Sequence, residues 1–146
     1  MCHTDWDGRF LGLAQHLAGW SKDPSTKVGA VLARGKFIVS PGYNGFPAGV
    51  EDSPERLNNR EVKYKMVLHA EENAILTAKQ DLTGCTMYTW PLQPCSRCTA
   101  KLIQAGVKRI VAPPPSEDHL SRWGEDFELS RQMCQEAGVE LVIRTL

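Results

Sequence analysis

The chain has 146 residues, a formal net charge of zero, 42% hydrophobic residues and 23% charged residues. This length fits one compact domain, which we expect to span residues 1–146. The neutral balance and the absence of a run of like charges argue against a nucleic-acid partner, because phosphate binding usually needs a basic surface. No apolar stretch approaches the length of a membrane span, so we expect no membrane partner.

Hydrophobic periodicity and turn residues predict alternating helices and strands along the chain. Apolar residues at helical spacing predict a first helix over residues 9–19. Strands are expected where short apolar runs lie between turn residues, over residues 28–32, 37–40, 85–90, 109–111 and 139–143. Helices are expected over residues 70–79, 95–105 and 123–137, and a mixture of loop and helix over residues 51–66. This order predicts an α/β fold with three α/β/α layers around a mixed five-stranded sheet, whose strands after residue 85 run parallel.

Two short motifs carry candidate metal ligands. His69-Ala70-Glu71 begins one predicted helix, and Pro94-Cys95-Ser96-Arg97-Cys98 begins another. The spacing of Cys95 and Cys98 places both sulfurs on one face at a helix start, where the helix dipole favours thiolates. His69 and Glu71 can share a site only if His69 lies at the helix cap, because residues two apart within a helix diverge.

The predicted ligand set favours catalytic zinc. His69, Cys95 and Cys98 supply three ligands and leave the fourth tetrahedral position open for water, which is typical of catalytic sites. Glu71 is the candidate acid–base group beside that water. The alternatives are a redox dithiol or a closed structural zinc site, which needs a fourth ligand. His3, His119 and Cys85 are possible fourth ligands, but none of them has paired spacing.

Cysteine usage and the N-terminus bear on the compartment. The five cysteines are an odd number, and the Cys95-x-x-Cys98 spacing fits metal binding in a reducing environment better than disulfides. The polar segment Met1–Asp7 lacks the basic and apolar regions of a signal peptide. We therefore expect a cytoplasmic protein.

Beyond the metal motifs, the chain resembles the cytidine deaminase-like superfamily, and within it the deoxycytidylate (dCMP) deaminases, over roughly residues 9–111. The matching segments are Ser21–Ala30, Gly42–Gly49, Lys63–Tyr64, His69–Ile75, Pro94–Cys98 and Leu102–Gly106. The resemblance implies a cytidine deaminase-like fold and zinc-dependent hydrolysis of dCMP to dUMP and ammonia. Zinc-bound hydroxide would attack C4 of the cytosine ring while Glu71 shuttles protons.

The resemblance also has implications for partners and leaves alternatives open. It implies a homo-oligomer, and dCTP and dTTP as possible effectors. The rival substrates are a free base, a nucleoside, a triphosphate or another heterocycle. A nucleic-acid editing deaminase and a non-catalytic zinc module are the more distant rivals.

Five residues are candidates for substrate contact. The superfamily residue that matches Asn44 contacts the substrate sugar, although asparagine in a Gly-rich loop also suits a turn. The resemblance supports a 5′-phosphate contact from Ser21 or Lys22. Arg97 is either a phosphate partner or a solvated helix residue, and Tyr43 could stack on a base or belong to the core.

Two parts of the sequence depart from the dCMP deaminase pattern. Gln93 stands where an aromatic residue is frequent, and the segment from Pro113 to Trp123 does not follow the expected pattern. Thr99, where alanine is common, is a minor change. Because both segments are expected to border the pocket, they bear on the preference for base and phosphate.

Overall fold

A computed structural model describes residues 3–146 of the chain. Met1 and Cys2, at the start of the polar N-terminal segment, lie outside the described residues. The elements follow in the order α1 (Trp6–Ala18), β1 (Gly29–Arg34), β2 (Phe37–Tyr43), α2 (Pro54–Asn58), α3 (Arg60–Met66), α4 (Ala70–Ala78), β3 (Thr86–Trp90), α5 (Ser96–Gln104), β4 (Arg109–Ala112), α6 (Glu117–Ala137) and β5 (Glu140–Ile143). None of the helices within residues 3–146 is long and apolar enough to cross a bilayer.

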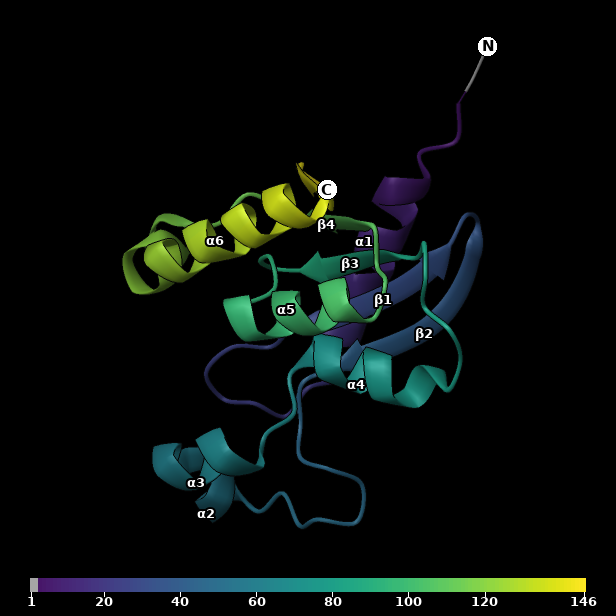
Figure 1. Ribbon diagram of the computed structural model, residues 1–146. Coiled ribbons are helices and arrows are strands. Elements are labelled where there is room, and N and C mark those ends of the chain that lie inside the picture. Colours follow the sequence, from purple (N-terminus) through teal and green to yellow (C-terminus); the bar gives the residue numbers. More distant parts are fainter. Residues whose placement is uncertain (1–2) are drawn as a thin grey trace.

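The five strands form one mixed sheet in the order β2-β1-β3-β4-β5 (Figure 1). Strand β1 pairs antiparallel with both β2 and β3, whereas β3, β4 and β5 pair in parallel. This arrangement confirms the predicted mixed five-stranded α/β fold. The parallel half follows from the β-α-β-α-β order of the chain after residue 85, because a parallel neighbour requires a crossover helix.

Side chains alternate between the two faces of the sheet, and each face carries its own buried cluster. One cluster packs β1, β3 and β4 against α1 through Val31, Tyr88 and Val111. The intervening residues of the same strands, including Leu32, Met87 and Ile110, point to the other face and join residues of α4, α5 and α6. Helix α1 therefore covers one face, and the three later helices cover the other (Figure 1).

Two helices begin earlier than the sequence predicts, because a polar residue caps each of them. The carboxylate of Asp5 accepts a hydrogen bond from the Gly8 amide at 2.9 Å, so α1 starts at Trp6. The hydroxyl of Ser116 accepts one from the His119 amide at 3.1 Å, so α6 starts at Glu117 and not at residue 123. The prediction at the end of α5 is confirmed, because Gly106 follows the helix with a φ of +92°.

Candidate active site

Both metal-binding motifs lie at helix starts, as the spacing argument requires. His69 is the N-cap of α4 with extended backbone, at φ −70° and ψ 156°. Cys95 is the N-cap of α5 with φ −65° and ψ 169°, and Cys98 lies in the first turn of that helix. The Nδ1 atom of His69 lies 3.6 Å from the Cys95 sulfur and 3.3 Å from the Cys98 sulfur. The structure therefore brings the three predicted ligands together, within 4.8 Å of one another.

The distances from the His69 nitrogen to the two cysteine sulfurs fit a tetrahedral zinc ion. Zinc–sulfur bonds of about 2.3 Å and zinc–nitrogen bonds of about 2.0–2.1 Å place tetrahedral N and S ligands about 3.6 Å apart. The observed separations of 3.3 and 3.6 Å match that value without a movement of the backbone. Within the described residues, the cluster contains three ligands and no fourth, so the donor set suits an open catalytic site.

The ligands influence the pKa values of one another. A hydrogen bond with Cys95 raises the pKa of His69 to about 9, against the opposing effect of burial. The hydrogen bond from the Cys98 thiol holds the pKa of Cys95 well below its ordinary value. Donation of that same hydrogen bond, together with burial, raises the pKa of Cys98. The metal-free cluster therefore carries an imidazolium and a thiol, and metal binding must displace their protons.

Glu71 lies in the first turn of α4, next to the ligand cluster. Its side chain is buried, with 4% of the residue exposed. Burial raises the pKa of Glu71 to about 7, although the neighbouring His69 acts in the opposite direction. A carboxyl group that titrates near neutral pH can both accept and donate a proton during one reaction cycle, which suits the predicted acid–base role.

Contacts between α4 and α5 fix the position of His69. The Glu72 carboxylate accepts a hydrogen bond from the His69 amide at 2.9 Å, and the Lys101 ammonium of α5 pairs with the same carboxylate. On its other side α4 lies directly against β2, where a side-chain carbon added at Gly42 would be 2.3 Å from the Ala70 carbonyl oxygen. The first turn of α4 is thus held from both sides.

A cavity of about 160 Å³ lies between the loops that follow α1 and β2. It is lined by Trp20, Lys22, Asp23, Tyr43, Asn44, Gly45, Phe46, Asp52, Leu57 and Val67. Val67 precedes His69 by two residues, and Gly45 forms a β-bridge with Leu68, so the cavity lies next to the ligand cluster. Three predicted substrate residues, Lys22, Tyr43 and Asn44, line this one cavity.

The side chain of Asn44 links the two loops around the cavity. Its carbonyl oxygen accepts a hydrogen bond from the Val28 amide at 2.9 Å, and its amide group donates to the Thr26 carbonyl at 2.8 Å. The Ser21 hydroxyl donates to the backbone carbonyl of Asn44 at 2.9 Å and is buried. The side chain of Asn44 therefore holds the segment after α1 against the segment after β2, and Ser21 supports this link.

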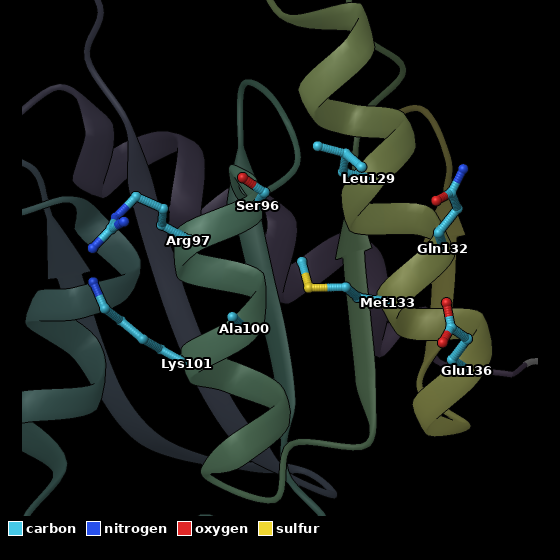
Figure 2. A pocket seen from close by; sticks show the side chains of 8 residues that line it. All are labelled: Ser96, Arg97, Ala100, Lys101, Leu129, Gln132, Met133 and Glu136. Carbon is cyan, nitrogen blue, oxygen red and sulfur yellow. The ribbon is translucent and has the colours of Figure 1, made fainter.

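Lys22 and Arg97 differ from Ser21 because both project from the surface. The Lys22 ammonium pairs with Asp52 at 3.1 Å across the cavity wall, and 71% of its side chain is exposed. Arg97 lies on α5 and borders a larger, shallow groove of about 470 Å³ between α5 and α6. Figure 2 shows Arg97 and Lys101 projecting from the side of α5 that faces away from α6. Arg97 therefore does not line the cavity that Lys22, Tyr43 and Asn44 share.

One contact at the site was missed by the sequence reasoning. The carboxylate of Asp126, on α6, accepts hydrogen bonds from both the amide and the hydroxyl of Ser96, at 2.8 and 2.5 Å. Ser96 lies between the two cysteine ligands. No motif could have indicated this contact, because 30 residues separate the partners and the sequence around Asp126 has no recognisable pattern.

Comparison with known proteins places this geometry in a family. Residues 4–113 match the family model of the cytidine and deoxycytidylate deaminase zinc-binding region. An uncharacterised deaminase encoded in the luxG 3′ region of Aliivibrio fischeri is 50% identical over 138 residues, which cover 94% of this chain and 92% of that protein. The mouse deoxycytidylate deaminase is 40% identical over 116 residues, and that match covers 75% of this chain and 65% of the mouse enzyme.

A solved structure supports the fold independently. The dCMP deaminase of cyanophage S-TIM5, in complex with dCMP and dUMP, superposes with a TM-score of 0.76 at 23% identity, covering 98% of this chain and 99% of the phage enzyme. At this level of identity, the match supports the cytidine deaminase-like fold alone. The family model and the relatives show more, and the chain belongs to the zinc-binding family of cytidine and deoxycytidylate deaminases.

Proposed function

We propose that this member of the deaminase family converts dCMP to dUMP and ammonia in a single catalytic domain. The observation that carries the proposal is the buried Glu71 carboxyl beside a cluster of three metal ligands, next to a cavity that carries a lysine. Relatives named deoxycytidylate deaminase, from mouse and from Mycobacterium phage D29, support dCMP as the substrate.

The residues of the chain divide the reaction between them. His69, Cys95 and Cys98 would hold zinc, which supplies a Lewis acid that makes water a nucleophile near neutral pH. Two thiolates offset much of the charge of the ion, so proton transfer depends on Glu71. In its ionised form Glu71 accepts the proton of the attacking water. It passes that proton to N3 of the ring. It then accepts the remaining proton of the hydroxyl added at C4 and delivers it to the departing amine, so that the C4–N bond breaks and ammonia leaves.

The cavity suits the sugar and phosphate of a mononucleotide. Its volume of about 160 Å³ is too small for a whole nucleotide, so the base must extend toward His69 and Glu71. Lys22 lies at the wall and can exchange its exposed partner Asp52 for a phosphate, because an exposed ion pair contributes little free energy. Tyr43 and Asn44 line the same cavity.

The experiment is a measurement of ammonia release from cytosine, deoxycytidine, dCMP and dCTP by wild type and by Glu71→Gln. We expect dCMP to give the highest kcat/KM, and Glu71→Gln to lower kcat on dCMP by about 10²–10⁴-fold. Zinc content, measured by atomic absorption, should be equal in the two proteins. Wild-type protein without activity on dCMP would refute the substrate, and an active Glu71→Gln would refute the role of Glu71.

Lys22 gives a separate test of the phosphate contact. Lys22→Ala should raise KM for dCMP about tenfold and leave kcat/KM for deoxycytidine unchanged, because only the nucleotide has the charge that Lys22 contacts. Arg97→Ala tests the alternative phosphate partner in the same assay. If Arg97→Ala raises KM for dCMP more than Lys22→Ala does, the phosphate contact belongs to Arg97 and not to Lys22.

The expectations for assembly and regulation form part of the same proposal. We expect a cytoplasmic homo-oligomer with dCTP and dTTP as effectors. A homo-oligomer would give a light-scattering mass that is a multiple of 16.2 kDa. It would also give dCMP kinetics that shift when either triphosphate is added. A monomer whose kinetics do not respond would refute this part and leave the deaminase assignment intact.

A further inference from the structure

The first half of α6 holds the segment that enters the metal-binding helix. Besides the bonds of Asp126 to Ser96, the Gln93 amide donates to the Phe127 carbonyl at 3.4 Å. The Ser130 hydroxyl donates to the Pro94 carbonyl, also at 3.4 Å. We call this set of contacts between residues 126–130 of α6 and residues 93–96 the α6 clamp. It ends at Ser96, one residue after the ligand Cys95.

Asp126 makes the strongest contact of the clamp, because a charged acceptor meets two donors in a bidentate geometry. Ser96 is the first residue of α5, so its amide is one of the helix-start N–H groups without an intrahelical acceptor. The carboxylate of Asp126 satisfies that amide and also interacts favourably with the positive end of the helix dipole. Figure 2 shows Ser96 at the start of α5, next to α6.

The amides of the first turn of α5 thus have different acceptors. The Ser96 amide bonds to Asp126, while the Thr99 amide bonds to the Cys95 carbonyl at 2.8 Å and closes the first helical turn. The Cys98 amide donates a hydrogen bond to the Cys95 sulfur. Loss of Asp126 would leave the Ser96 amide without its acceptor. The peptide group between Cys95 and Ser96 would then be free to rotate, and this rotation would change the direction of the Cys95 sulfur.

The clamp includes Gln93, one of the residues that depart from the dCMP deaminase pattern. Gln93 is buried, with 7% of the residue exposed, and its amide donates to a backbone carbonyl of α6. Helix α6 begins at Glu117, within the divergent segment that follows Pro113. Gln93 therefore contacts the helix that begins in this segment, at Phe127, beyond the end of the segment at Trp123.

We propose that Asp126 is a positioning residue that fixes the Cys95–Cys98 turn in its zinc-binding geometry by acting through Ser96. The proposal rests on the proposed zinc site but not on the identity of the substrate. Asp126 touches neither the ligand sulfurs nor the carboxyl of Glu71 by any contact found among residues 3–146. Loss of Asp126 is therefore expected to change the geometry and affinity of the metal site directly, and the reaction rate only as a consequence.

The test is the zinc affinity of Asp126→Ala, measured by competition with a chromophoric chelator, together with the visible spectrum of the cobalt-substituted protein. Outer partners of metal ligands contribute about 10–100-fold to metal affinity. We expect about tenfold weaker zinc binding for Asp126→Ala, because it acts at one remove from the ligand. The d–d bands of cobalt should shift or broaden, since they report the geometry of the ligand set. Glu125→Ala, which removes an exposed carboxylate from the same turn of α6, should leave both measurements unchanged.

Asp126→Asn separates positioning from general stability. Asparagine keeps the shape and one acceptor oxygen, so its zinc affinity should lie between those of wild type and Asp126→Ala, and it serves as the test if Asp126→Ala does not fold. The proposal is overturned if Asp126→Ala keeps wild-type zinc affinity and an unchanged cobalt spectrum, even if its melting temperature falls. If only Asp126→Asn folds, the same result in that variant overturns the proposal. Neither measurement needs substrate, so a protein that is inactive on dCMP would refute the proposed substrate and leave this result interpretable.

Discussion

The contact between β2 and α4 gives a prediction about how closely the acid–base residue must be placed. Gly42 lies in β2 under the first turn of α4, which carries Glu71. In Gly42→Ala the new methyl carbon would lie 2.3 Å from the Ala70 carbonyl oxygen and 2.8 Å from the Ala74 amide nitrogen. Both are backbone atoms, so no side-chain rotation can relieve the overlap, and the helix and the strand must move apart.

The size of this movement follows from the distances. To reach an ordinary separation of 3.0–3.4 Å, the 2.3 Å distance must grow by about 0.7–1.1 Å. If strand and helix share the movement, α4 shifts by roughly 0.4–0.6 Å, and Glu71 moves with it. A displacement of about 1 Å costs roughly 10²-fold in rate, so half of it corresponds to about a tenfold loss of kcat. Overpacking should also lower the free energy of unfolding by about 1–3 kcal/mol.

The assay compares Gly42→Ala with Gly29→Ala at a temperature where both are folded. In Gly29→Ala the new methyl carbon would lie 1.9 Å from the Ala14 carbonyl oxygen of α1, which is a closer overlap on the opposite face of the sheet. Helix α1 carries no proposed zinc ligand and no acid–base residue. Gly29→Ala should therefore lose at least as much thermal stability and keep a higher kcat. A Gly42→Ala protein with wild-type kcat, or equal kcat losses in the two variants, would refute the reasoning.

Three further predictions concern the metal and the termini. Zinc binding at pH 7.5 should release about two protons, from His69 and Cys98. Calorimetry in buffers of different ionisation enthalpy measures the number of protons released. Release of none would contradict the assigned protonation states. A chelator should abolish deaminase activity and added zinc should restore it in wild type, whereas Cys98→Ser should need a higher zinc concentration. Bonds from Arg109 and Tyr88 lower the pKa of Asp7, so its stabilising effect is present above the unfolded value of 3.8 and is lost as the pH falls below it. In Asp7→Asn the free energy of unfolding should fall by roughly 1–2 kcal/mol at pH 7 and by almost nothing at pH 2.5. Urea titration at each pH measures these losses, and an equal loss at pH 7 and pH 2.5 would contradict the role of the Asp7 carboxylate.

The ligand cluster could be predicted from sequence because its geometry is local. A histidine or cysteine at a helix cap has extended backbone, and the backbone of the next few residues fixes where the following side chains point. His69 and Cys95 are such caps, so residue spacing alone indicates the directions of Glu71 and Cys98. Only the approach of one helix start to the other depends on the sheet order, which the family resemblance implies.

The contacts of Asp126 and Asn44 could not be predicted, because they join segments whose approach depends on the whole fold. Asp126 reaches Ser96 only because α6 packs beside α5, and the sequence reasoning placed the start of that helix six residues too late. For Asn44 the sequence indicated both a turn role and a sugar contact. Its side chain bonds to Val28 and Thr26, which are 16 and 18 residues away, so it links two loops and does not hold a turn within its own loop.

The position of both motifs at helix starts also explains how the work is divided at the site. The N-termini of α4 and α5 converge on one point, and each contributes partial positive charge that favours thiolates at Cys95 and Cys98. Thiolate ligands reduce the positive charge that zinc can exert on water, and the proton must therefore go to a base of suitable pKa. Burial gives Glu71 that pKa, and α4, which carries Glu71, packs directly on Gly42. The ligand choice, the burial of the carboxyl and the glycine in β2 are thus parts of one requirement, and a change in any one of them should slow the same proton transfer.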